Sequence, residues 1–165
     1  MQTKIRITLG IALCLLIVLT TVASRNVLSS QGNGGRLEGT WDALLTRRNC
    51  DTGDPLSPPL PELLTFMSGG TMLDSTSAAL PATKTPGHGV WTHVAGNTYQ
   101  YSFKFFSFGP PASPTAFTGW AIVSQTLELD STANEYTSSG TAHFYNTSGI
   151  QVGSGCSTTT GTRFE

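Results

Sequence analysis

Gly39-Thr40-Trp41 opens the first strand-like segment of this chain, and Arg163 lies near the end of the last one. Cys50 and Cys156 repeat that pairing a few residues further in from each end. Residues that face each other on antiparallel strands have a constant sum of residue numbers. The sum is 204 for Trp41 and Arg163 and 206 for the two cysteines, so one register nearly satisfies both pairs. The first and last strands are therefore expected to lie side by side, and a closed barrel is the simplest all-β shape that achieves this.

The rest of the chain also indicates β structure. Ser, Thr and Gly are abundant, β-branched and aromatic residues cluster, and turn signals recur at short intervals, which is typical of a sandwich or barrel. We predict an all-β, antiparallel up-and-down barrel of about eight strands, with a β-sandwich as the alternative. The predicted strands are Leu37–Asn49, Glu62–Met67, Thr71–Ser75, Gly89–Ala95, Thr98–Phe108, Thr118–Leu129, Glu135–Tyr145 and Ile150–Phe164.

The N-terminal residues have the pattern of a signal sequence. Lys4 and Arg6 precede a largely apolar stretch, and Val22-Ala23-Ser24 supplies small residues for cleavage. A secreted or periplasmic location is therefore expected. The alternative is a membrane anchor through residues 7–23, since that stretch approaches the ~17 residues that span a bilayer. The predicted parts are a signal helix (1–24), a flexible Ser/Gly-rich linker (25–35) and a barrel domain (36–165).

Charge and cysteine content narrow the classes of partner. Without residues 1–24 the chain has seven Lys and Arg against ten Asp and Glu, which does not suit a nucleic-acid binder. Only Cys50 and Cys156 remain after processing, so a disulfide is expected in an oxidising compartment. Two isolated cysteines without nearby histidines do not form a structural zinc site, and we expect neither a metal nor a cofactor. The sequence leaves the oligomeric state open.

The terminal motif resembles a known family. Gly39-Thr40-Trp41 together with Arg163 is similar to the arrangement in calycins, the group that includes lipocalins, fatty-acid-binding proteins and avidins. The resemblance implies that Trp41 packs across the closed end of the barrel and that Arg163 lies over it. The chain also resembles a group of uncharacterised exported bacterial proteins through Pro86-Gly87-His88-Gly89-Val90-Trp91 and the closing segment around Gly155-Cys156 and Gly161-Thr162-Arg163. That second similarity implies no activity.

Aromatic residues suggest where a ligand would bind. Tyr99, Tyr101, Phe103 and Phe105 share one face of a predicted strand. In an eight-stranded barrel such rings either fill the interior or line one cavity for a small apolar or amphipathic ligand. The glycines beside His88 allow a close approach of the backbone, which suits a cavity rim or a tight turn. The candidate ligand-binding residues are His88, Trp91, Tyr99, Tyr101, Phe103 and Trp120.

No catalytic residues are assigned from the sequence. There is no Gly-x-Ser-x-Gly elbow, and His88 and His93 fall on opposite faces of one strand. Glu62 could point into the barrel with Arg47 as its partner, although a surface ion pair is the commoner arrangement. Two alternatives to a binding protein remain. One is a barrel enzyme similar to allene oxide cyclases that uses His88, Arg47 and Glu62, and the other is a cell-envelope protein with a filled interior.

Overall fold

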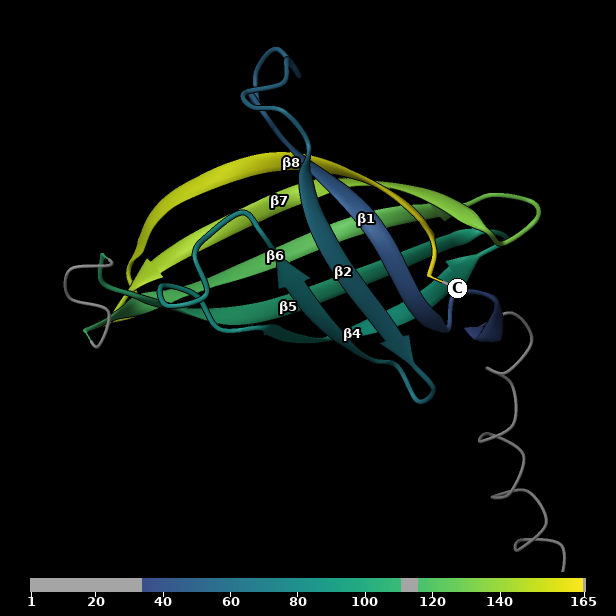
Figure 1. Ribbon diagram of the computed structural model, residues 1–165, viewed down its shortest axis with the longest axis horizontal. Coiled ribbons are helices and arrows are strands. Elements are labelled where there is room, and N and C mark those ends of the chain that lie inside the picture. The colour runs from purple at the N-terminus through teal and green to yellow at the C-terminus, as the bar shows by residue number, and fades with distance from the viewer. Residues whose placement is uncertain (1–33, 111–115, 165) are drawn as a thin grey trace, which may run out of the picture. The chain divides into compact units, whose positions relative to one another are not determined.

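A computed structural model of the chain describes residues 34–110 and 116–164. In the described part, eight antiparallel strands close into one barrel, each pairing with its neighbours in sequence and the first pairing with the last (Figure 1). The predicted all-β, up-and-down barrel is therefore confirmed. The elements are η1 (Gly34–Arg36), β1 (Gly39–Arg48), β2 (Leu60–Met67), β3 (Thr71–Thr76), β4 (Gly87–Ala95), β5 (Thr98–Phe108), β6 (Phe117–Leu129), β7 (Glu135–Asn146) and β8 (Gln151–Arg163).

The predicted strand bounds agree with the structure to within two residues. The first strand was expected to begin at Leu37 but begins at Gly39, because the preceding residues form a turn around the Arg163 side chain. The predicted signal helix (1–24) and nearly all of the predicted linker (25–35) lie outside the described residues.

The seam between β1 and β8 has the register expected from the residue numbers. Trp41 lies opposite Arg163, and Arg48 lies opposite Cys156, so the sum of 204 holds along the whole pairing. Cys50 follows β1 by two residues and forms a disulfide with Cys156, with 5.2 Å between their Cα atoms. The predicted disulfide is therefore present, and it joins the two ends of the barrel domain across a sequence separation of 106 residues.

One end of the barrel is closed by Trp41, which is fully buried and donates from Nε1 to the Leu37 carbonyl oxygen at 2.9 Å. The Arg163 guanidinium lies 4.5 Å from the Trp41 ring centroid. It also donates to the Ala133 carbonyl oxygen at 2.7 Å, to the Glu38 carbonyl oxygen at 2.8 Å and to the Arg36 carbonyl oxygen. A planar, multidentate cation can stack on an indole and satisfy several carbonyls at once, which explains why arginine occupies this position.

The interior of this closed half is filled with large side chains. Alternate residues of each strand point inward, and at this end the inward positions carry rings and branched aliphatic groups that leave almost no accessible surface. Burial of this apolar area is the main force that stabilises the barrel. The core residues are Leu37, Trp41, Leu64, Phe66, Met72, Trp91, Tyr99, Leu127, Leu129 and Tyr136.

Two glycines let β4 pass close to its neighbours. A Cβ atom at Gly87 would lie 2.5 Å from the Phe103 ring and 2.9 Å from an Asp74 carboxylate oxygen. A Cβ atom at Gly89 would lie 2.1 Å from the Ser102 carbonyl oxygen. The close approach expected around His88 is thus an approach of the β4 backbone to β5 and to Asp74. It lets Phe103 and Asp74 lie directly against β4.

Candidate functional site: a cavity at the open end of the barrel

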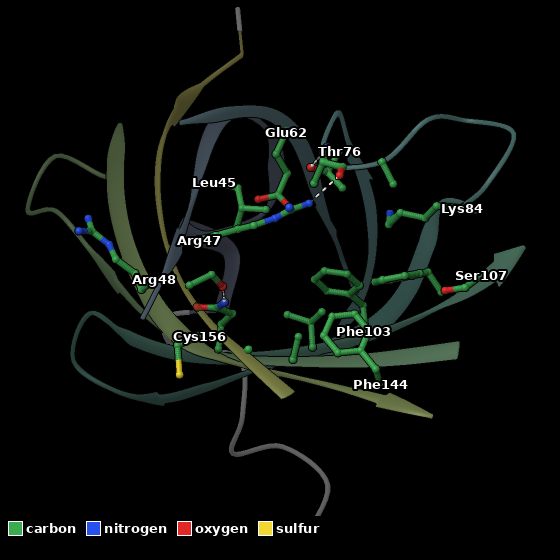
Figure 2. A pocket seen from close by; sticks show the side chains of 18 of the residues that line it. Leu45, Arg47, Arg48, Glu62, Thr76, Lys84, Phe103, Ser107, Phe144 and Cys156 are labelled. Carbon is green, nitrogen blue, oxygen red and sulfur yellow. Dashed lines mark hydrogen bonds between the residues drawn. The ribbon is translucent and has the colours of Figure 1, made fainter. Parts of the chain in front are cut away.

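The other half of the barrel is hollow. A cavity of about 450 Å³ opens at the end where β1 finishes and β8 begins (Figure 2). This volume falls within the range of about 300–1,000 Å³ that is usual for small-molecule sites. Its main lining residues are Leu45, Arg47, Glu62, Thr76, Ala78, Lys84, Tyr101, Phe103, Phe105, Val123, Gln125, Ala142, Phe144, Gly155 and Ser157.

The inner limit of the cavity is set by three residues that carry polar groups. Glu62, Tyr101 and Gln125 line it, and on each of their strands the next inward residue toward the closed end belongs to the packed core. Those core residues are Leu64, Tyr99 and Leu127. The cavity therefore ends on a polar layer, beyond which the barrel is solid.

One wall of the cavity is aromatic. The rings of Tyr101 and Phe103 are stacked with 6.3 Å between centroids, and Phe105 continues the row at 6.5 Å from Phe103. All three come from alternate positions of β5, so strand geometry alone places them on one face. Phe144 lies near Phe103 in Figure 2. This wall offers apolar surface to a bound molecule.

A buried ion pair lies beside the aromatic wall. The Lys84 ammonium group is 2.6 Å from Oδ2 of Asp74, and the two side chains are 7% and 0% exposed. The same ammonium group lies 4.5 Å from the centroid of Phe105. Because both charges are removed from water and paired, the ion pair adds no net charge to the cavity.

Glu62 is the second buried acid of this region and is only 5% exposed. Burial, the nearby charge of Asp74 and a hydrogen bond with the Asp74 side chain together raise the pKa of Glu62 to about 9. Glu62 is therefore protonated at neutral pH. With both carboxyls ionised, Oδ1 of Asp74 would lack a donor, and the Glu62 proton supplies one. The pair then consists of one neutral acid and one carboxylate that is matched by Lys84.

Gln125, which lies on β6, completes the polar layer. Its Nε2 atom donates to Ser157 Oγ at 2.8 Å, while its buried Oε1 atom has no hydrogen-bond partner among the described residues. Tyr101 is satisfied differently, because its hydroxyl lies 3.2 Å from Ser138 Oγ and burial raises its pKa. The Gln125 oxygen is thus an acceptor at the inner end of the cavity that the protein leaves unused.

The mouth is bordered by the segment 77–86, which is bound to the end of β5. Phe108 donates its backbone N–H to the Thr83 carbonyl oxygen at 2.9 Å, and Thr85 donates to the Phe106 carbonyl oxygen at 3.0 Å. Arg47 reaches across from β1 and donates to the Ala78 carbonyl oxygen at 2.7 Å (Figure 2). These contacts hold Lys84 and Ala78 over the cavity.

The predicted ligand-binding residues are distributed between the cavity, the core and the outer surface. Tyr101 and Phe103 line the cavity. Trp91 and Tyr99 lie in the core, where Trp91 donates from Nε1 to the Met67 carbonyl oxygen at 3.0 Å.

Trp120 and His88 both lie on the outside of the barrel. Trp120 stacks on Tyr145 at 5.7 Å between ring centroids. His88 is exposed on the outer face of β4, opposite Lys104. Neither residue lines the cavity.

Glu62 and Arg47, which the sequence suggested as partners, interact with other groups. Both residues line the cavity, but Arg47 bonds the Ala78 carbonyl oxygen and Glu62 interacts with Asp74. The ion pair that the described residues do form, between Lys84 and Asp74, was not predicted. Strand alternation did indicate that Asp74 points inward, since it shares a face of β3 with the core residue Met72. Lys84 carried no such signal, because it lies in a loop.

Residues 34–110 and 116–164 offer neither a cluster of metal ligands nor a helix suited to cross a bilayer. That part of the chain contains no group of three or more His, Cys, Asp or Glu side chains that could hold a metal ion. It also contains no helix with the length and apolarity needed to cross a bilayer. Comparison of the chain with protein-family models, with curated proteins and with solved structures gave no match. The closed eight-stranded barrel and the packing of Arg163 over Trp41 are consistent with the resemblance to calycins.

Proposed function

We propose that this protein binds a small apolar or amphipathic molecule in the cavity at the open end of its barrel. The observation that carries the proposal is a cavity of about 450 Å³ within a closed barrel, with an aromatic wall from β5 and a polar inner end. An apolar body would gain about 25 cal/mol for each Å² that it removes from water against this wall. The ligand-binding residues of the proposal include Tyr101 and Phe103, together with Phe105 and Phe144.

The two other functions considered from the sequence receive less support. A cell-envelope protein with a filled interior would have no cavity larger than a few water molecules, whereas this one is hollow. The enzyme hypothesis needs His88, Arg47 and Glu62 to converge. Arg47 and Glu62 share the cavity, but His88 lies on the outer face of β4.

We also propose that the protein acts outside the cytoplasm. The Cys50–Cys156 disulfide supports this location, because such bonds persist in oxidising compartments. N-terminal sequencing of the protein recovered from a secreting host tests the predicted cleavage after Ser24. A mature chain that still carries residues 7–23 would favour the anchor instead.

Binding can be tested with N-phenylnaphthylamine, a neutral probe whose fluorescence rises in apolar surroundings. We expect saturable binding of one probe per chain. Gly155→Phe should weaken it at least tenfold, because Gly155 lines the cavity and a Cβ atom there would have only the Phe144 ring within 4 Å, at 4.0 Å. A Cβ atom at that position therefore makes no clash, and the ring attached to it would take up cavity space.

The matched control is Gly35→Phe, since Gly35 is exposed and its Cβ position is open. It should bind the probe as the unsubstituted protein does. Absence of probe binding, or binding that Gly155→Phe leaves unchanged, would contradict the proposed function.

A further inference from the structure

We infer that the bound molecule places an uncharged hydrogen-bond donor, such as a hydroxyl group, at the inner end of the cavity, against the Oε1 atom of Gln125. This inference rests on the proposed function and names the chemical class of its ligand. The rest of the molecule would be an alkyl or aryl body that lies along Phe103 and Phe105.

The protein leaves one hydrogen-bond acceptor open at the inner end of the cavity. Gln125 is 4% exposed, lines the cavity and uses its Nε2 atom on Ser157, whereas its Oε1 atom has no partner among the described residues. Glu62 offers no second open acceptor, because its carboxyl group interacts with both the Asp74 side chain and the Thr159 hydroxyl group. A buried acceptor without a donor costs about 1–3 kcal/mol, and a ligand that supplies the donor removes that cost.

The charges around the cavity favour an uncharged group at its inner end. At the inner end, the Asp74 carboxylate and the Lys84 ammonium group are 2.6 Å apart and cancel, and the protonated Glu62 adds no charge. The cation Arg47 also lines the cavity, but its guanidinium group bonds the Ala78 carbonyl oxygen at the mouth.

A carboxylate headgroup at the inner end would meet the Gln125 acceptor oxygen and leave an unbalanced negative charge there. An ammonium headgroup would find no unpaired carboxylate there, because Asp74 is matched by Lys84. Burial of an unbalanced charge is costly, so a neutral donor is the group that fits.

The apolar and polar surfaces of the cavity are separated from each other. The aromatic wall runs from Tyr101 toward the mouth through Phe103 and Phe105. The polar layer lies where the cavity ends against the packed core. A molecule with a donor at one end and an apolar body therefore enters with the polar end first.

The experiment uses displacement of N-phenylnaphthylamine from the purified, disulfide-bonded protein at neutral pH. Five competitors share one alkyl chain and differ only at the end group: decane, decyl methyl ether, decanol, decanoate and decylamine. We expect decanol to bind roughly three- to tenfold more tightly than the ether or decane, the gain of a net hydrogen bond. Decanoate and decylamine should both bind more weakly than decanol. Equal binding of decanol and the ether, or tightest binding of either charged compound, would overturn the inference.

Two variants locate the effect. Gln125→Leu removes the open acceptor and should bring the decanol-to-ether ratio close to one while the probe still binds. Glu135→Leu, an exposed position near the closed end, should leave the ratio unchanged. A ratio that persists in Gln125→Leu would also overturn the inference.

The design separates this inference from the function on which it rests. Failure of every competitor and of the probe would reject both, whereas uniform binding of all five competitors would reject only the donor.

Discussion

The buried acid Glu62 should make the stability of the barrel fall as pH rises, and Glu62→Gln should abolish that dependence. In the folded protein, burial and the neighbouring Asp74 raise the pKa of Glu62 from 4.5 to about 9. Between these two pH values the folded state keeps the proton and the unfolded state releases it. The unfolded state then binds fewer protons, so the free energy of unfolding decreases with increasing pH in this window.

The magnitude follows from the width of the window. A single proton changes the free energy of unfolding by about 1.4 kcal/mol per pH unit, so the interval from pH 4.5 to about 9 corresponds to a loss of about 6 kcal/mol at most. The contribution of Glu62 is largest below pH 4.5 and is lost by about pH 9. Glutamine keeps a neutral donor toward Asp74 but cannot ionise, so the variant should resemble the unsubstituted protein at pH 5 and exceed it at pH 9.

The assay is urea unfolding followed by tryptophan fluorescence at intervals between pH 5 and pH 9. The difference in unfolding free energy between the two proteins separates Glu62 and its partner Asp74 from the titrating groups elsewhere in the chain. Glu135→Gln, which neutralises an exposed carboxyl, serves as the control and should show the same pH dependence as the unsubstituted protein. Parallel pH profiles for the unsubstituted protein and Glu62→Gln would refute the reasoning, because they would show that Glu62 is ionised in the folded barrel.

Three further substitutions test what holds the barrel together. Replacing Cys50 and Cys156 with serine should lower the free energy of unfolding by about 4–5 kcal/mol, the chain-entropy value for a closed loop of about this length, as measured by urea unfolding. Arg163→Lys should cost about 2 kcal/mol or more, since lysine cannot bond three carbonyl oxygens and stack on an indole at once, and a lowered melting temperature would report it. Lys84→Met should cost about 3–5 kcal/mol by leaving the buried Asp74 charge unpaired, and adding Asp74→Asn should restore most of the loss in a double-mutant cycle.

The fold could be predicted because its evidence lies in local patterns and in residue numbers. Alternation identifies strands without tertiary information, and the numbers of Trp41 and Arg163 specify the register that closes the barrel. The pairing of Cys50 with Cys156 followed from the count of two remaining cysteines, and nearly the same register brings them together. These inferences needed only that neighbouring strands pair.

The site was harder to predict because it depends on how loops and faces meet. Asp74 belonged to a predicted strand, but its partner Lys84 comes from the segment 77–86, whose path alternation does not encode. The glycines beside His88 did indicate a close backbone approach. The group they approach is Phe103 on the inside of the barrel, whereas His88 itself points outward.

Two glycines on β8 show that the hollow half of the barrel is a property of the sequence. Gly161 faces inward at the closed end, where a Cβ atom would lie 2.2 Å from the Tyr136 ring, so its small size is required by packing. Gly155 faces inward at the open end, where a Cβ atom would find only the Phe144 ring within 4 Å, at 4.0 Å. Packing does not account for glycine there, since a larger residue fits and would bury more apolar surface. The absence of a side chain at this position instead keeps the space between the aromatic wall and β8 open, which is what a binding cavity requires.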